Sequence, residues 1–189
     1  MCGWNFEEGD ITFDGMSILD RPIECKKSMA FIPDNPELYE ALTGIQYLNF
    51  VSDIYEVNKQ KREDLIKKYA DALELTKNLG DIISSYSHGM KQKLAIISAL
   101  VHEPKLLILD EPFVGLDPKS SFTLKEIMKD MCKNGSSIFF STHILEVAEK
   151  LCNKIAIIKK GKLVVSGNIE TVKGDSSLED LFMELTNHE

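Results

Sequence analysis

The chain has 189 residues, which is enough for one domain with a sizeable core. Hydrophobic residues make up 43% and charged residues 28%, values that exclude wholesale disorder. The net charge is −8 and no basic run occurs, which argues against binding of nucleic acid. The longest aliphatic runs are four residues, far below the roughly 20 that a membrane span needs. The acidic N-terminus lacks the apolar stretch of a signal peptide.

The cysteines predict neither a disulfide framework nor a metal site. No two are spaced as a CxxC pair, and the histidines are not spaced with them as zinc ligands. We interpret them as free thiols in a reducing compartment. They are Cys2, Cys25, Cys132 and Cys152.

Two short elements are predicted near the N-terminus. Residues 10–13 and 16–19 flank Asp14-Gly15, the preferred link of a two-residue β-hairpin. The apolar run 29–32 predicts a buried strand, and the Pro33-Asp34-Asn35-Pro36 stretch ends it in a loop.

A mostly helical insert is predicted for residues 38–100. Thr43 and Gln46 form a capping-box pattern ahead of a helix over 45–57. Residues 59–78 carry apolar side chains at helical spacing. A further helix opens at Ser87 and ends before Pro104.

Strands and helices alternate from residue 106 onward, which predicts an α/β fold with helices packed on a parallel sheet. The last helix is predicted to be capped by Ser176 and Glu179. The expected strands are 106–110, 137–141, 155–158 and 163–165, and the expected helices are 119–133 and 144–151.

An acidic pair follows the strand at 106–110. Asp110 and Glu111 stand where a parallel strand leaves the sheet, the edge at which such sheets place ligands. An Asp there can hold Mg²⁺ through water, and the adjacent Glu can polarise an attacking water in phosphoryl transfer. The alternative is an acidic pair with no function.

Three further segments carry candidate residues. Ser87 and Gly89 at a helix start offer a hydroxyl and free N–H groups to an anion, or form a plain N-cap. His143 follows a strand and could donate a hydrogen bond to a phosphate, or be structural. The Gly115-Leu116-Asp117-Pro118 segment is by itself only a turn.

The order of these segments resembles the nucleotide-binding domain of ABC-type ATPases over nearly the whole chain. The segment from Tyr86 to Met90 resembles the signature motif, with His88 and Met90 as variant residues. The 106–110 strand resembles the Walker B strand, Glu111 the catalytic glutamate and His143 the switch histidine. The 115–117 turn resembles the D-loop, and the tail at 178–186 is most similar to subunits of bacterial ABC-2-type exporters.

The resemblance implies an ATP- and Mg²⁺-dependent mechanism. Two such domains would pair as a homo- or heterodimer with ATP between them, and Asp117 would communicate across the dimer. Ser87, His88, Gly89 and Met90 would line the nucleotide, Asp110 would hold Mg²⁺, Glu111 would activate water, and His143 would contact the terminal phosphate. A separate transmembrane permease subunit would meet the helical insert, so the protein would be cytoplasmic and peripheral on the inner membrane face.

Two departures from the family pattern stand out. No GxxxxGKS/T loop, the Walker A P-loop, occurs in the sequence. The chain therefore reads as an N-terminally truncated form with weak ATP binding of its own and with apolar sheet faces left exposed. Asp34 stands where the family usually has a glutamine that contacts Mg²⁺.

The expected architecture is a P-loop NTPase-like parallel sheet with a helical insert, incomplete at its N-terminus. We expect one partial ATPase domain over 1–189, a helical subdomain over 38–100 and a C-terminal tail over 165–189. The alternatives are a catalytically silent regulatory or interaction module with this fold, and an ABC ATPase of DNA repair or translation.

Overall fold

The computed structural model describes residues 9–187 and divides into two compact units. Unit 1 comprises Met1–Leu109 and Phe113–Phe139, and unit 2 comprises Asp110–Pro112 and Phe140–Glu189. The part of the chain that is described contains no helix long and apolar enough to cross a bilayer.

Unit 1 begins with the predicted hairpin, in a shorter form. Strands β1 (Thr12–Phe13) and β2 (Met16–Ser17) pair antiparallel around Asp14 and Gly15. Both turn residues have positive φ, 51° and 74°, as the Asp-Gly pair predicts. Helix α1 (Pro22–Lys27) follows, which the sequence analysis did not predict, and its Cys25 is buried against Ile18 and Met29.

A three-stranded sheet has the order β3-β4-β5. Its strands are β3 (Met29–Ile32), β4 (Leu106–Asp110) and β5 (Ser137–Ser141), each at the predicted bounds. β3 and β4 are parallel, with Ala30 opposite Leu107 and Ile32 opposite Leu109, and these four side chains are buried. Phe31 and Phe139 are 47% and 65% exposed, so the sheet does present apolar side chains to solvent.

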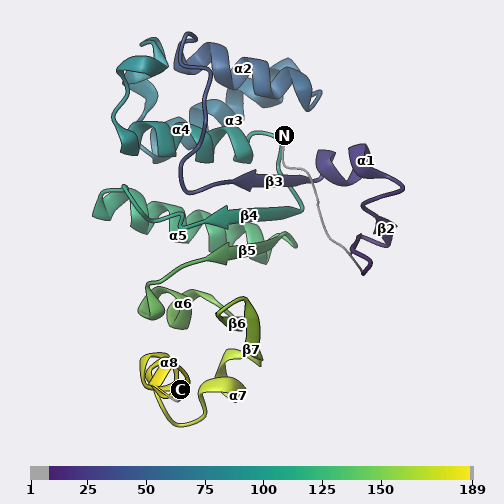
Figure 1. Ribbon diagram of the computed structural model, residues 1–189. Helices are drawn as coiled ribbons and strands as arrows, with labels where there is room; N and C mark the ends of the chain where they lie inside the picture. Colours follow the sequence, from purple (N-terminus) through teal and green to yellow (C-terminus); the bar gives the residue numbers. More distant parts are fainter. Residues whose placement is uncertain (1–8, 188–189) are drawn as a thin grey trace. The chain divides into compact units, whose positions relative to one another are not determined.

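The helical insert gathers beside β3 (Figure 1). It contains α2 (Gly44–Ile54), α3 (Lys59–Ala72) and α4 (His88–Leu100), with the short 3-10 helices η1 (Thr76–Asn78) and η2 (Ile83–Ser85) between. Thr43 and Gln46 form the predicted capping box. The helix predicted over 59–78 ends early, because Glu74 takes a left-handed φ of 58° that a helix cannot continue through.

Helix α4 is the core of unit 1. Eight of its thirteen residues are buried, and it packs against α2, α3 and β3. At its far end His102 stacks on Tyr55 with ring centroids 3.7 Å apart, and its Nε2 lies 3.3 Å from the Met29 carbonyl oxygen. Helix α5 (Pro118–Lys133) completes the unit.

Unit 2 contains α6 (Leu145–Leu151), β6 (Lys154–Lys159), β7 (Lys162–Asn168), α7 (Ile169–Lys173) and α8 (Leu178–Asn187). β6 pairs antiparallel with β7, which confirms the two strands predicted at 155–158 and 163–165. β6 is not a strand of the three-stranded sheet, so the parallel sheet predicted from residue 106 onward is shorter than expected. The core of unit 2 is small and is formed by Ile157, Ile169 and Leu178. Helix α7 was not predicted.

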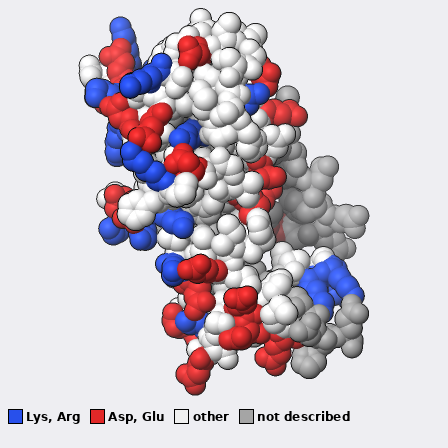
Figure 2. All heavy atoms as spheres, turned by 90° about the vertical axis from the view of Figure 1, so that its left-hand side faces the viewer, with Lys and Arg blue, Asp and Glu red and all other residues white. Residues whose placement is uncertain are grey.

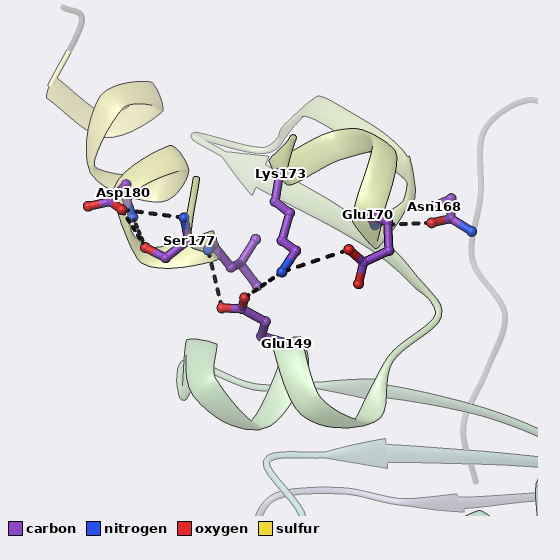
Figure 3. A network of polar contacts seen from close by, with 7 residues as sticks. Glu149, Asn168, Glu170, Lys173, Ser177 and Asp180 are labelled. Carbon is purple, nitrogen blue, oxygen red and sulfur yellow. Dashed lines mark hydrogen bonds and ion pairs between the residues drawn. The ribbon is translucent and has the colours of Figure 1, made fainter. Parts of the chain in front are cut away.

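A polar network ties the helices of unit 2 together (Figure 3). Lys173 Nζ lies 2.9 Å from Glu149 Oε1, and the other oxygen of Glu149 accepts a hydrogen bond from the Leu178 N–H. The cap of α8 is Ser177 with Asp180, one residue later than predicted, because these two side chains bond each other's backbone N–H groups.

Charged side chains of both signs are interspersed on the face shown in Figure 2. Separately from this view, ion pairs among the described residues include Lys67 with Asp71 at 3.0 Å and Lys119 with Glu74 at 2.5 Å. Exposed pairs of this kind contribute little to stability.

Candidate functional site

Most of the predicted site residues, together with neighbours that were not predicted, form two groups, one in each unit. We name the group in unit 2 the acid–histidine cluster: Asp110, Glu111, Ser141 and His143. We name the group in unit 1 the signature cluster: Ser87, His88, Gly89, Gly115, Asp117 and Lys93.

The acid–histidine cluster forms where β4 and β5 end. Glu111 Oε1 lies 3.0 Å from His143 Nδ1, so the predicted base and switch residues are brought together. Glu111 is 22% exposed and His143 is 71% exposed. A ligand can therefore reach the imidazole directly while the carboxylate is more sheltered.

Ser141 forms hydrogen bonds with both acidic residues, and this role was not predicted from the sequence. Its hydroxyl donates a hydrogen bond to Asp110 Oδ1 and accepts one from the Glu111 N–H at 3.3 Å. A Ser two positions before a strand-end histidine was the only signal available in the sequence. That spacing does not indicate which strand pairs with β5.

Glu111 has an unusual backbone. Its φ is 45°, in the left-handed region that residues with a Cβ seldom occupy. Such conformations cost of order 1–3 kcal/mol and concentrate at functional sites. The strained residue is the one predicted to activate water.

The signature cluster begins with the N-cap of α4. The Ser87 side chain accepts a hydrogen bond from the Met90 N–H at 3.3 Å, which leaves its own O–H to donate elsewhere. The N–H groups of His88 and Gly89 lie in the first helical turn, where intrahelical acceptors are missing. A hydroxyl, free N–H groups and the helix dipole together suit a phosphate.

The turn at Gly115 packs directly against this helix start. A Cβ at Gly89 would lie 2.6 Å from the Gly115 carbonyl oxygen, and a Cβ at Gly115 would lie 2.6 Å from His88 Cδ2. Gly115 also has a φ of 79°. The variant His88 is therefore a packing partner of the turn, and neither glycine position has room for a side chain.

Asp117 is held within its own chain. It is the N-cap of α5, and it accepts hydrogen bonds from the Ser120 hydroxyl at 2.6 Å and the Ser120 N–H at 2.9 Å. Lys93 Nζ of α4 lies 2.9 Å away. The Ser120 hydroxyl, then Lys93, hold the pKa of this carboxyl far below its usual range. Lys93 was missed, because nothing in the sequence relates two residues 24 positions apart.

Asp34, the residue in place of the usual glutamine, lies exposed in the loop that follows β3. Met90 is partly buried in the first turn of α4. No group of three or more potential ligands among residues 9–187 is already arranged to hold a metal ion. Asp110 nevertheless fits water-mediated Mg²⁺ binding, because it is exposed and only its Oδ1 accepts from Ser141.

Comparison with known proteins identifies the family. A family model described as ABC transporter matches residues 3–114. The chain belongs to the ABC transporter family. It is 34% identical over 184 residues to the ABC-type transporter ATP-binding protein EcsA of Bacillus subtilis, covering 95% of this chain and 74% of EcsA. It is 31% identical to the ATP-binding protein NatA of the same organism, over 92% of this chain and 71% of NatA.

Other relatives are much longer than this chain. An ABC transporter ATP-binding protein of Synechocystis, sll0415, is 32% identical, and the match covers 84% of this chain but 46% of that protein. The chain thus spans about half the length of some of the curated relatives it matches and about three quarters of others.

Solved structures confirm the α/β ATPase fold. A structure described as an ATP-binding subunit of an ABC transporter superposes with a TM-score of 0.91 at 33% identity, covering 96% of this chain and 78% of the other. CbiO1 of Clostridium perfringens, described as part of the transporter complex cbiONQ, gives 0.72 at 23% identity, over 96% of this chain and 72% of CbiO1. The resemblance to ATP-binding subunits of ABC transporters is therefore confirmed, as is the fold class.

Proposed function

We propose that this chain is the ATP-binding partner of a transmembrane permease and works in a dimer with a second ABC ATPase domain. The observation that carries the proposal is the acid–histidine cluster, in which a carboxylate for a metal, a carboxylate for water and a histidine for phosphate lie together. Family membership and the fold support it. The permease itself is suggested only by CbiO1, which is described as part of a transporter complex.

The residues of unit 2 have distinct tasks in this proposal. When bound, Mg²⁺ neutralises phosphate charge. Asp110 would hold Mg²⁺ through water, and its Oδ1 accepts a hydrogen bond from Ser141. Glu111 accepts the proton of the attacking water, and His143, placed 3.0 Å from it, donates a hydrogen bond to the terminal phosphate.

The signature cluster serves an ATP held mainly by the second domain. Ser87 donates its free hydroxyl, and the N–H groups of His88 and Gly89 add the positive end of α4. This assignment suits a chain in which no GxxxxGKS/T loop occurs. Asp117 would then act across the dimer through the backbone it positions, because its carboxylate is engaged by Ser120 and Lys93.

The first experiment is an equilibrium titration of the folded chain with Mg·ATP, alone and mixed with a second ABC ATPase domain. That domain should carry a GxxxxGKS/T loop but have its own signature serine replaced. We expect weak binding by the chain alone and ATP turnover only in the mixture. Ser87→Ala should then abolish the turnover. Micromolar binding by the chain alone would contradict the assignment of the signature cluster to a partner's nucleotide.

The role of Glu111 is tested at saturating ATP in a second mixture, in which the other domain keeps its signature serine but has its own catalytic glutamate replaced, so that turnover depends on the acid–histidine cluster of this chain. Glu111→Gln should lower turnover by about 10²-fold or more, the usual contribution of a general base, while nucleotide binding is kept. Glu179→Gln is the matched control, since it makes the same charge change at an exposed position of α8. Equal turnover in the wild-type chain and Glu111→Gln would remove Glu111 from the mechanism.

A further inference from the structure

One hydroxyl contacts both the last residue of β4 and the residue that follows it. Ser141, the last residue of β5, donates to Asp110 Oδ1 through its O–H and accepts the Glu111 N–H at 3.3 Å through its lone pair. The single O–H donor of the serine and one of its two acceptor lone pairs are thereby directed at the acidic pair. All three residues belong to unit 2.

The hydrogen bond that Ser141 accepts affects the backbone conformation of Glu111. That residue has a φ of 45°, a conformation that persists only where the surroundings hold it. The Ser141 oxygen is the acceptor for its N–H, so it is the contact that stabilises the left-handed backbone. Pro112 follows directly and disfavours the right-handed α region for Glu111, so an extended backbone is the conformation to which this residue would relax. Relaxation of φ would carry the carboxylate away from His143.

The donor contact bears on Asp110. An O–H bonded to Oδ1 fixes the rotation of the carboxylate and commits one oxygen, so the other is the one left for a metal-bound water. Partners that orient a metal-binding carboxylate in this way usually change metal affinity or activity by 10–100-fold when removed.

We propose that Ser141 is a positioning residue that sets the backbone of Glu111 and the carboxylate of Asp110 at the same time. The proposal for Asp110 rests on the proposed function, whereas the proposal for the Glu111 backbone does not. Ser141 touches neither nucleotide nor water in this assignment and acts through its two neighbours.

The first test needs no nucleotide. Amide hydrogen exchange at Glu111 is measured by NMR in the wild-type chain, Ser141→Ala, Ser141→Thr and Ser137→Ala. Ser141→Ala should exchange roughly tenfold faster at Glu111, the effect of one lost hydrogen bond. Ser141→Thr keeps the hydroxyl and suits a strand, so it should restore slow exchange. Ser137→Ala, on the same strand at its other end, should leave Glu111 unchanged.

The outcomes separate positioning from general destabilisation. Exchange within twofold of wild type in Ser141→Ala would overturn the proposal. Faster exchange throughout unit 2, equal in Ser141→Ala and Ser141→Thr, would overturn it as well, because the hydroxyl would then not be responsible. If Ser141→Ala does not fold, Ser141→Thr and Ser141→Cys still separate hydroxyl from size.

The second test uses the mixture in which the other domain keeps its signature serine but lacks its own catalytic glutamate, and varies Mg²⁺ at a fixed, saturating ATP concentration. Ser141→Ala should raise the Mg²⁺ concentration for half-maximal turnover by about 10-fold or more, and Ser141→Thr should restore it. An unchanged Mg²⁺ dependence would remove the Asp110 part of the proposal. If the wild-type mixture shows no turnover, the proposed function fails. The hydrogen-exchange test of the Glu111 backbone does not depend on that result.

Discussion

The two units position their candidate residues by different physical means. Unit 1 buries most of α4, so the start of that helix, with Ser87 and Gly89, is set by an apolar core. Unit 2 has a core of three buried residues, and α6, the helix after His143, contains no buried residue. Its candidate side chains are positioned by hydrogen bonds and ion pairs at the surface. The residues proposed to bind a nucleotide and the residues proposed for its chemistry are therefore held by cores of very different size.

The largest expected effect is on the core of unit 1. Leu94 is fully buried in α4, so Leu94→Ala should lower the free energy of unfolding by about 2–5 kcal/mol. Chemical denaturation measures it. Phe122→Ala, at a position 65% exposed on α5, is the control and should stay within about 0.5 kcal/mol of wild type. Equal losses in both variants would show that the buried side chains of α4 do not stabilise unit 1 more than exposed ones do.

Acid should weaken unit 1 before unit 2. Burial lowers the pKa of His102 to about 4, and its Nδ1 is buried without a partner among the described residues. A histidine with a depressed folded pKa contributes stability that is present above its unfolded pKa of about 6.5. That contribution is lost as the pH falls toward 4, and the loss approaches about 3 kcal/mol.

The measurement for this prediction is thermal unfolding between pH 7 and pH 4, followed by NMR signals of each unit. Unit 1 signals should weaken first. His102→Gln should flatten the profile over this range, since it cannot gain a proton. A profile that His102→Gln leaves unchanged would show that this histidine does not cause the loss.

The cap of α5 should have a smaller effect. Asp117→Ala removes the side chain that accepts from the Ser120 N–H, which should cost about 1 kcal/mol. Asp117→Asn keeps the cap but loses the charge facing Lys93, so it separates capping from ion pairing. Urea unfolding measures the free energy of unfolding of the wild-type chain and of the two variants. Equal values for all three would contradict both the capping and the ion-pair contribution.

The smallest effect is expected in the network of Figure 3. Lys173, then the Leu178 N–H, lower the pKa of Glu149. The resulting stability is present above the ordinary glutamate pKa of about 4.3 and is lost as the pH falls below it. Glu149→Gln should therefore weaken α8 less than Asp117→Ala weakens α5. Glu179→Gln is the control, and local amide exchange in α8 is the measurement.

Much of the local structure followed from sequence patterns. The strands at 29–32, 106–110 and 137–141, the Asp14-Gly15 turn and the Thr43 cap were correctly predicted, because each depends on neighbours within a few residues. Short helices such as α7 and the early end of α3 were missed. Five-residue helices carry little periodicity, and a single left-handed residue such as Glu74 gives no apolar signal.

The α/β class, the order of the motifs and the placement of Asp110 and Glu111 at a strand end all follow from patterns along the chain. The contacts that these residues make with distant segments follow only from the folded arrangement. Ser141 meets Asp110 from 31 positions away, and Lys93 meets Asp117 from another helix. The reason is physical: spacing along a strand or helix sets which side chains share a face, whereas the neighbour of that face depends on how distant strands and helices pack.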